Sequence, residues 1–148
     1  MTIVLVTDIP APAETVFDVL VDLRGYDRWL SRSADYAGTT KVSTDPVAAG
    51  TTYTEPSRLG VRRGTVTELT RPSTVTFHQP MTLRPRLFGV IDIHAAYSLT
   101  PMAGGVRVER VVTVALPWQV KLVAPLVLAR FRRESARTLA ALKAFVVA

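Results

Sequence analysis

Arg110 is the residue of this sequence whose position points most directly to chemistry. It lies in the run from Val106 to Val114, where valines recur at alternate positions and an arginine takes one of their places. Alternate residues of a strand share a face, so Arg110 is expected on an apolar face. A buried arginine keeps its charge and needs acceptors. We expect Arg110 to bind a ligand carboxylate or enolate, to pair with Glu55 or Glu68, or to reach water near the sheet end.

Further polar-tipped and aromatic residues fall on the same predicted inner faces. Tyr97 shares the apolar face of a strand over 89–100, and Tyr53 shares a side with Glu55 in a strand over 50–57. A tyrosine in such a place orients a carbonyl or donates a proton, or it is a core aromatic with a satisfied hydroxyl. The complete set of cavity-lining candidates is Trp29, Tyr53, Phe77, Ile93, Tyr97, Arg110, Leu128, Phe131 and Ser135.

The two histidines raise the question of a metal site. Asp92 and His94 are two positions apart on the outer face of the strand over 89–100, and His78 ends a neighbouring strand. Three such side chains are able to hold zinc. That face is expected to be exposed to solvent and no further ligand accompanies the three, so we expect no metal and no cofactor.

Several kinds of catalytic site have no counterpart in the sequence. Cysteine is absent, which excludes thiol catalysis and cysteine-bound zinc. Neither histidine belongs to a recognisable Ser/His/Asp arrangement, and no glycine-rich phosphate loop or inward pair of carboxylates occurs. No residue is therefore assigned a catalytic role, and binding without turnover is favoured over catalysis.

The elements that position these residues change their periodicity along the chain. Residues 2–9 predict a strand, residues 12–22 predict a helix, and Tyr26 to Leu30 predicts a second short helix. Further strands are expected near 35–44, 50–57, 61–70, 73–79, 89–100 and 105–115. Short connections between them favour an antiparallel meander of seven strands in all.

The last 31 residues predict one long amphipathic helix over 118–148. Its apolar stripe includes Leu128 and Phe131 and is interrupted by Ser135 and Thr138. A seven-stranded sheet buried on one face needs a long cover, and only this helix is long enough. We expect a single α+β domain over 1–148, in which a curved sheet wraps around the helix and leaves a cavity.

Charge and hydropathy limit the partners. The net charge is +6, and residues 118–148 carry six basic side chains against Glu134 alone. The basic face has no exposed aromatics, which argues against RNA. Leu122, Val123 and Leu126 lie off the core stripe, and a dimer contact, a membrane contact or a cavity mouth stay open for them. No signal peptide or membrane span is recognisable, so we expect a cytoplasmic protein, monomeric or homodimeric.

Several motifs taken together resemble the START-like (SRPBCC) superfamily, and within it the polyketide cyclase/dehydrase and lipid-transport group. They are found in residues 8–20, Tyr26-Asp27-Arg28-Trp29, Gly50-Thr51-Thr52-Tyr53, residues 97–101 and residues 104–108. The likeness covers nearly the whole chain. It implies a helix-grip fold whose internal cavity takes an apolar or polyketide-like ligand, since members include cyclases, lipid carriers, ubiquinone-binding proteins and ribosome-associated toxins.

Two functions follow as expectations. The first is binding of a hydrophobic small molecule (lipid, polyketide or aromatic compound) between sheet and helix, as a carrier or as a cyclase-like enzyme. In a cyclase a tyrosine or Arg110 would polarise a carbonyl. The alternative is an interaction protein whose basic C-terminal helix contacts the ribosome, RNA or an anionic membrane.

Overall fold

Seven antiparallel strands form one sheet in the computed structural model, which describes residues 1–148. The sheet order is β1-β7-β6-β4-β3-β2, and the short β5 pairs with β3 and β6. The strands are β1 (Thr2–Ile9), β2 (Thr52–Pro56), β3 (Gly60–Thr70), β4 (Thr74–His78), β5 (Met81–Leu83), β6 (Val90–Met102) and β7 (Gly105–Ala115).

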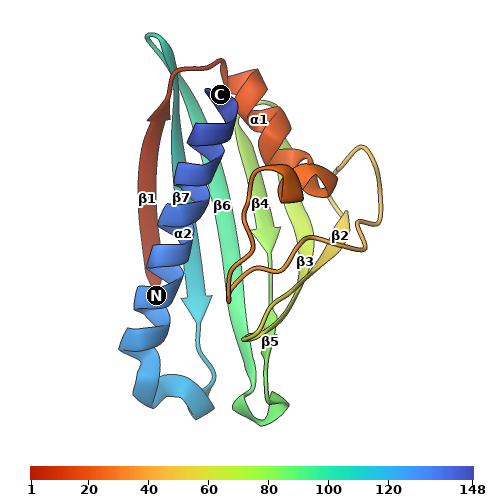
Figure 1. Cartoon of the computed structure of the whole chain (residues 1–148), viewed down its shortest axis with the longest axis vertical. Coiled ribbons are helices and arrows are strands. Elements are labelled where there is room, and N and C mark those ends of the chain that lie inside the picture. Colours follow the sequence, from red (N-terminus) through yellow and green to blue (C-terminus); the bar gives the residue numbers. More distant parts are fainter.

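Two α-helices cover one face of this sheet. They are α1 (Ala13–Val21) and α2 (Ala124–Val146), and three short 3₁₀ helices accompany them: η1 (Leu23–Arg28), η2 (Arg86–Phe88) and η3 (Trp118–Val123). Figure 1 shows α2 lying across β1, β7 and β6, with α1 beside its C-terminal end. This is the α+β helix-grip arrangement that the sequence predicts.

The inner face of the sheet follows from strict alternation. On β6, residues Ile91, Ile93, Ala95, Tyr97 and Leu99 are buried, and the residues between them are partly or fully exposed. The β7 residues around Arg110 alternate in the same way, because the strand is apolar on one side only. Apolar side chains from both strands join one cluster of 28 buried residues.

The helix α2 is buried unevenly along its length. Its fully buried residues are Ser135, Thr138, Leu139 and Leu142, all in its second half. In the first half, Val127 and Phe131 are only partly buried, and Leu126 is 72% exposed. The C-terminal half therefore packs tightly on the sheet, whereas the N-terminal half leaves space beneath it.

The predicted strand near 35–44 is wrong. This segment is irregular and makes one isolated bridge, between Thr40 and Thr54. Gly38 and Lys41 adopt positive φ angles of 105° and 54°, which lie outside the β region. The sheet still has seven strands, because β5 forms within a stretch that the sequence indicates as a connection.

The predicted helix over 118–148 is also too long. Residues 118–123 form η3, and α2 begins only at Ala124. Pro125 is the physical reason, since proline lacks an N–H and is tolerated in the first turn of a helix but not in its interior. No helix of the structure combines the length and the apolarity needed to cross a membrane.

Candidate functional site

A cavity of about 280 Å³ lies between the inner face of the sheet and α2. Seventeen of its 27 lining residues are hydrophobic. Of the nine candidates from the sequence, the cavity brings together seven: Tyr53, Phe77, Ile93, Tyr97, Arg110, Phe131 and Ser135. Arg84 and Phe88 are the lining residues that are exposed, so they mark the mouth.

Trp29 and Leu128 do not line the cavity. The Trp29 ring packs against Tyr26, with ring centroids 4.9 Å apart, and its buried indole N–H has no hydrogen-bond partner. Tyr26 takes the place beside the cavity that the sequence suggests for Trp29. Leu128 packs on the hydrophobic core instead, because Val127 and Phe131, one turn apart, occupy the cavity side of α2.

Arg110 is held by neutral groups. Its Nε donates to Ser135 Oγ at 3.3 Å, and another guanidinium nitrogen donates to the Tyr97 hydroxyl. The guanidinium carbon also lies 5.1 Å from the centre of the Tyr97 ring, within cation–π range. Neither Glu55 nor Glu68 pairs with it. Arg110 is thus a half-buried cation without a counter-charge, directed into an apolar cavity.

Apart from Arg84 at the exposed mouth, the other charged groups of the lining are paired. Glu55 binds Arg62, with Nε 3.2 Å from Oε1, and these two residues are cross-strand neighbours on β2 and β3. Arg130 binds Asp35 at 2.6 Å. Glu134 of the lining binds an arginine one turn later on α2. Because these carboxylates are neutralised locally, none offsets the charge of Arg110 across the cavity.

A row of aromatic rings forms one wall of the cavity. Phe77 stands edge-on between Tyr53 and Tyr97, at centroid distances of 6.0 and 6.2 Å. Tyr53 lies over Gly64, its cross-strand partner, where a Cβ would collide with the ring. Glycine at this position therefore lets the tyrosine lie flat against the sheet.

Both tyrosine hydroxyls of this wall have an unused donor. Tyr53 accepts a hydrogen bond from Gln79 Nε2 at 2.6 Å, and Tyr97 accepts one from Arg110. Each hydroxyl accepts one hydrogen bond and donates none within the protein, so its own O–H remains available to donate to a ligand in the cavity. Burial raises the pKa of Tyr53 well above its usual value, and the nearby Glu55 raises it further. Tyr53 is consequently a neutral donor at physiological pH.

A second polar network lies at the edge of the cavity. The Tyr36 hydroxyl lies 2.9 Å from Thr39 Oγ1, which donates to Glu55 Oε2 at 2.7 Å. Burial raises the pKa of Tyr36 to about 12. This network holds the irregular segment 35–44 against β2.

Several residues that line the cavity are not predicted from the sequence. Gln79 follows Phe77 at strand spacing, and this alternation is the signal that identifies it. Asp35 and Arg130 carry no such signal, because they meet only when the irregular segment packs on α2. Inside the mouth, the arrangement offers an apolar slot with one cation that has no carboxylate partner, Arg110, and two hydroxyl donors, which suits a ligand that has acceptor oxygens.

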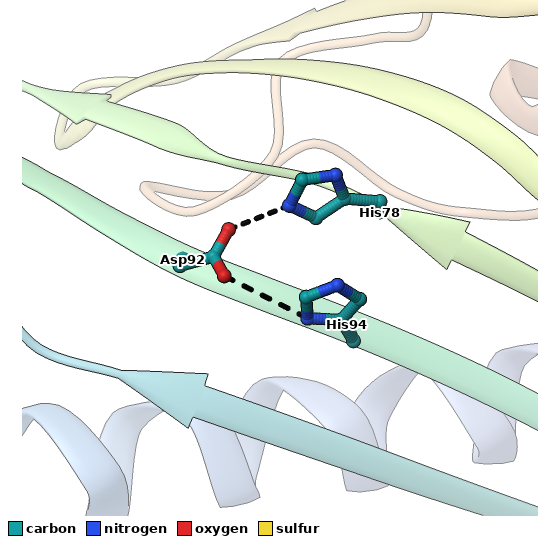
Figure 2. Close-up of side chains that lie close together, drawn as sticks. All are labelled: His78, Asp92 and His94. Carbon is teal, nitrogen blue, oxygen red and sulfur yellow. Dashed lines mark hydrogen bonds and ion pairs between the residues drawn. The ribbon is translucent and has the colours of Figure 1, made fainter.

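The two histidines lie elsewhere, on the opposite face of the sheet. His78, Asp92 and His94 gather there, as Figure 2 shows. The sequence predicts no metal here because no fourth protein ligand accompanies the three residues. The structure nevertheless brings one ligand atom of each within 4.8 Å of the others, and none of the three residues lines the cavity.

Comparison with solved structures supports the fold. The protein TTHA0849 from Thermus thermophilus superposes with a TM-score of 0.75 at 18% identity, over 99% of this chain and 97% of that one. A protein from Rhizobium leguminosarum gives 0.73 at 15% identity, over 99% and 93%. The di-domain ARO/CYC protein StfQ from the steffimycin biosynthetic pathway gives 0.76 at 13% identity, and the match covers 98% of this chain but 50% of StfQ.

No curated protein matches the chain. The sequence pattern of one family, described as polyketide cyclase / dehydrase and lipid transport, matches residues 1–146. This span is almost the entire chain and contains every element that builds the cavity. The chain therefore belongs to the polyketide cyclase/dehydrase and lipid transport family.

Proposed function

We propose that the protein binds a compact, largely apolar small molecule with at least one acceptor oxygen in the cavity between the sheet and α2. The observation that carries the proposal is Arg110, a cation without a carboxylate partner beside an apolar slot. A ligand carboxylate, enolate or polarised carbonyl supplies the missing acceptor. The apolar remainder of the ligand fills the space between Phe77, Ile93 and Phe131.

The volume of the cavity limits the size of the ligand that it can hold. A volume of about 280 Å³ is just below the roughly 300–1,000 Å³ that small-molecule sites usually span. This favours an aromatic or short polyketide-like compound over a two-chain lipid. Tyr53 and Tyr97 stand on the two sides of Phe77, so a flat ligand with oxygens at separated positions matches their hydroxyl donors.

Binding without turnover remains the preferred form of this function. A cyclase needs a group that removes a proton as well as groups that polarise a carbonyl. Arg110 and the tyrosines are donors, and the lining carboxylates are engaged by arginines. In a cyclase-like reaction, Arg110 and Tyr97 would stabilise an enolate oxygen while the cavity excludes water.

The alternative, a basic helix that contacts RNA or an anionic membrane, has less support. Arg130 binds Asp35, and Arg137 binds Glu134 and donates to the Ser31 carbonyl at 2.8 Å. These arginines tie α2 to the rest of the chain, so the basic face offers fewer unpaired cations than the sequence suggests. A steep fall of affinity for RNA with rising salt would favour this alternative.

Paired aromatic probes test the proposal. Naphthoate carries a carboxylate, and methylnaphthalene is its neutral analogue. Naphthoate should bind more tightly, and Arg110→Met should weaken it by roughly 10- to 150-fold, the equivalent of losing a charge-assisted hydrogen bond of about 1.5–3 kcal/mol. Methylnaphthalene should bind both proteins equally.

The matched control is Arg107→Met, on the same strand. Arg107 is exposed and pairs with Asp8 at 2.9 Å, away from the cavity. Its substitution should leave both affinities unchanged. Equal affinity of the wild type and Arg110→Met for naphthoate would show that Arg110 does not bind the ligand. If neither probe binds the wild type, the proposed cavity function is contradicted.

A further inference from the structure

A cluster of metal-ligand side chains lies on the outer face of the sheet, remote from the cavity. It consists of His78 on β4 with Asp92 and His94 on β6 (Figure 2). These are the only two histidines of the chain. One ligand atom from each residue lies within 4.8 Å of the others.

The sheet register brings the two histidines together. His78 and His94 are direct cross-strand partners. The flanking pairs carry the backbone hydrogen bonds, since Gln79 N–H donates to the Ile93 carbonyl at 2.7 Å. The histidine pair is therefore non-hydrogen-bonded, the type in which opposite side chains are closest. Their rings stack with centroids 4.2 Å apart and planes 11° from parallel.

Asp92 completes the cluster from the same face of β6. One of its oxygens lies 2.6 Å from His78 Nε2, and the other lies 3.8 Å from His94 Nδ1. No lysine or arginine pairs with Asp92. Asp92 therefore places one carboxylate oxygen toward each imidazole, so ligand atoms from all three side chains face one another on the outer face of the sheet.

We propose that His78, Asp92 and His94 bind a divalent transition metal, Zn²⁺ in the first instance, in a site that bridges β4 and β6. Two imidazole nitrogens and one carboxylate oxygen are ligands that zinc accepts, and they disfavour Mg²⁺ and Ca²⁺, which require oxygen ligands. Tetrahedral zinc with bonds near 2.0–2.1 Å holds its ligand atoms about 3.3 Å apart. The ligand atoms need to approach one another by at most about 1.5 Å to reach that spacing, a change that side-chain rotation provides.

The surroundings define the remaining coordination. Threonines flank the pair in the same cross-strand row, with Thr65 opposite His78 and Thr113 opposite His94. His94 and Thr113 are exposed, so water has access to the fourth position. The site is independent of the cavity, although β6 carries residues of both on its two faces.

Equilibrium dialysis of untagged protein against Zn²⁺ tests this site. The wild type should bind one Zn²⁺ per chain. His94→Gln and Asp92→Asn each remove a direct ligand, so each should weaken binding by more than the roughly 10- to 100-fold that the loss of an outer-shell partner costs. Glu109→Gln, which changes an exposed acid without an ion pair on neighbouring β7, should bind as the wild type does.

Proton NMR supplies a second readout that does not depend on stability. The chain has only two histidines, so their imidazole proton signals are simple to assign. Addition of one equivalent of Zn²⁺ per chain should shift or broaden the imidazole signals of both residues together. A wild type that binds no Zn²⁺, or one whose binding survives His94→Gln, would overturn the proposal. Naphthoate binding by His94→Gln should be unchanged, so this result is separate from the fate of the cavity.

Discussion

Replacing two arginines of the cavity lining by methionine should have very different consequences for stability. Arg62 pairs with Glu55, whose side chain is 6% exposed, and Arg110 pairs with no acid. Methionine keeps most of the arginine stem and removes the charge in both cases. Comparing the two variants therefore distinguishes an arginine that stabilises the fold from an arginine that binds a ligand.

The contacts of each arginine determine how much its replacement changes the free energy of unfolding. In Arg62→Met, Glu55 keeps only the hydrogen bond from Thr39, and its buried charge loses compensation. Breaking a buried ion pair in this way costs about 3–5 kcal/mol, a large part of the roughly 5–15 kcal/mol that stabilises a domain. In Arg110→Met, Tyr97 and Ser135 lose a donor that water in the cavity can replace, and a half-buried charge is removed. The net change should stay within about 1 kcal/mol of zero.

Urea unfolding at pH 7, followed by far-UV circular dichroism, measures both changes. A loss of about 3 kcal/mol or more in Arg110→Met, equal to that of Arg62→Met, would show that Arg110 is structural and refute the reasoning.

Three further outcomes are expected. Ser135→Leu places a larger side chain at a buried position of the cavity wall, so naphthoate affinity should fall about tenfold or more and overpacking should lower the free energy of unfolding by about 1–3 kcal/mol; unchanged affinity in calorimetric titration would contradict this. Leu142→Ala, at a fully buried position, should cost about 2–5 kcal/mol in urea unfolding, whereas Leu122→Ala, at a 99% exposed position, should cost under about 0.5 kcal/mol; similar losses would contradict the packing of α2. Burial raises the pKa of Tyr36 to about 12 and that of Tyr53 further, so their contribution to stability is complete below about pH 10 and is lost as the pH rises above it, where unfolded tyrosines ionise; a tyrosinate absorbance that develops fully near pH 10 in the folded protein would contradict this.

Alternation made the inner face of the sheet predictable from sequence. Valines around Arg110 and apolar residues around Tyr97 are spaced for one face of a strand, and both strands form as expected. The same regularity placed Tyr53 and Phe77 on the cavity side. These inferences succeed because strand geometry converts sequence spacing directly into direction.

The conformation of irregular segments does not follow from residue spacing in the same way. Residues 35–44 are rich in residue types that favour strands, yet positive φ angles at Gly38 and Lys41 prevent a strand. The segment instead carries Tyr36 and Asp35 to the cavity edge. The partnership of Asp35 with Arg130 depends on packing between residues 95 apart in sequence. Tertiary contact decides such pairs, and local pattern does not encode it.

The histidine cluster shows a similar limit. The spacing of Asp92 and His94 indicates a shared face, but the partner of His94 depends on the register between β4 and β6. A slip of one residue would turn His78 to the inner face. The stacked pair therefore becomes visible only once the strand register is known.

Native mass spectrometry tests the central claim most directly. The wild type and Ser135→Leu are exposed side by side to an organic extract of the cells that make the protein, then desalted and sprayed under native conditions. The cavity account predicts one small molecule per wild-type chain, released by organic solvent, and little or none on Ser135→Leu. A wild type that stays empty, or equal occupancy of both proteins, would contradict binding between the sheet and α2.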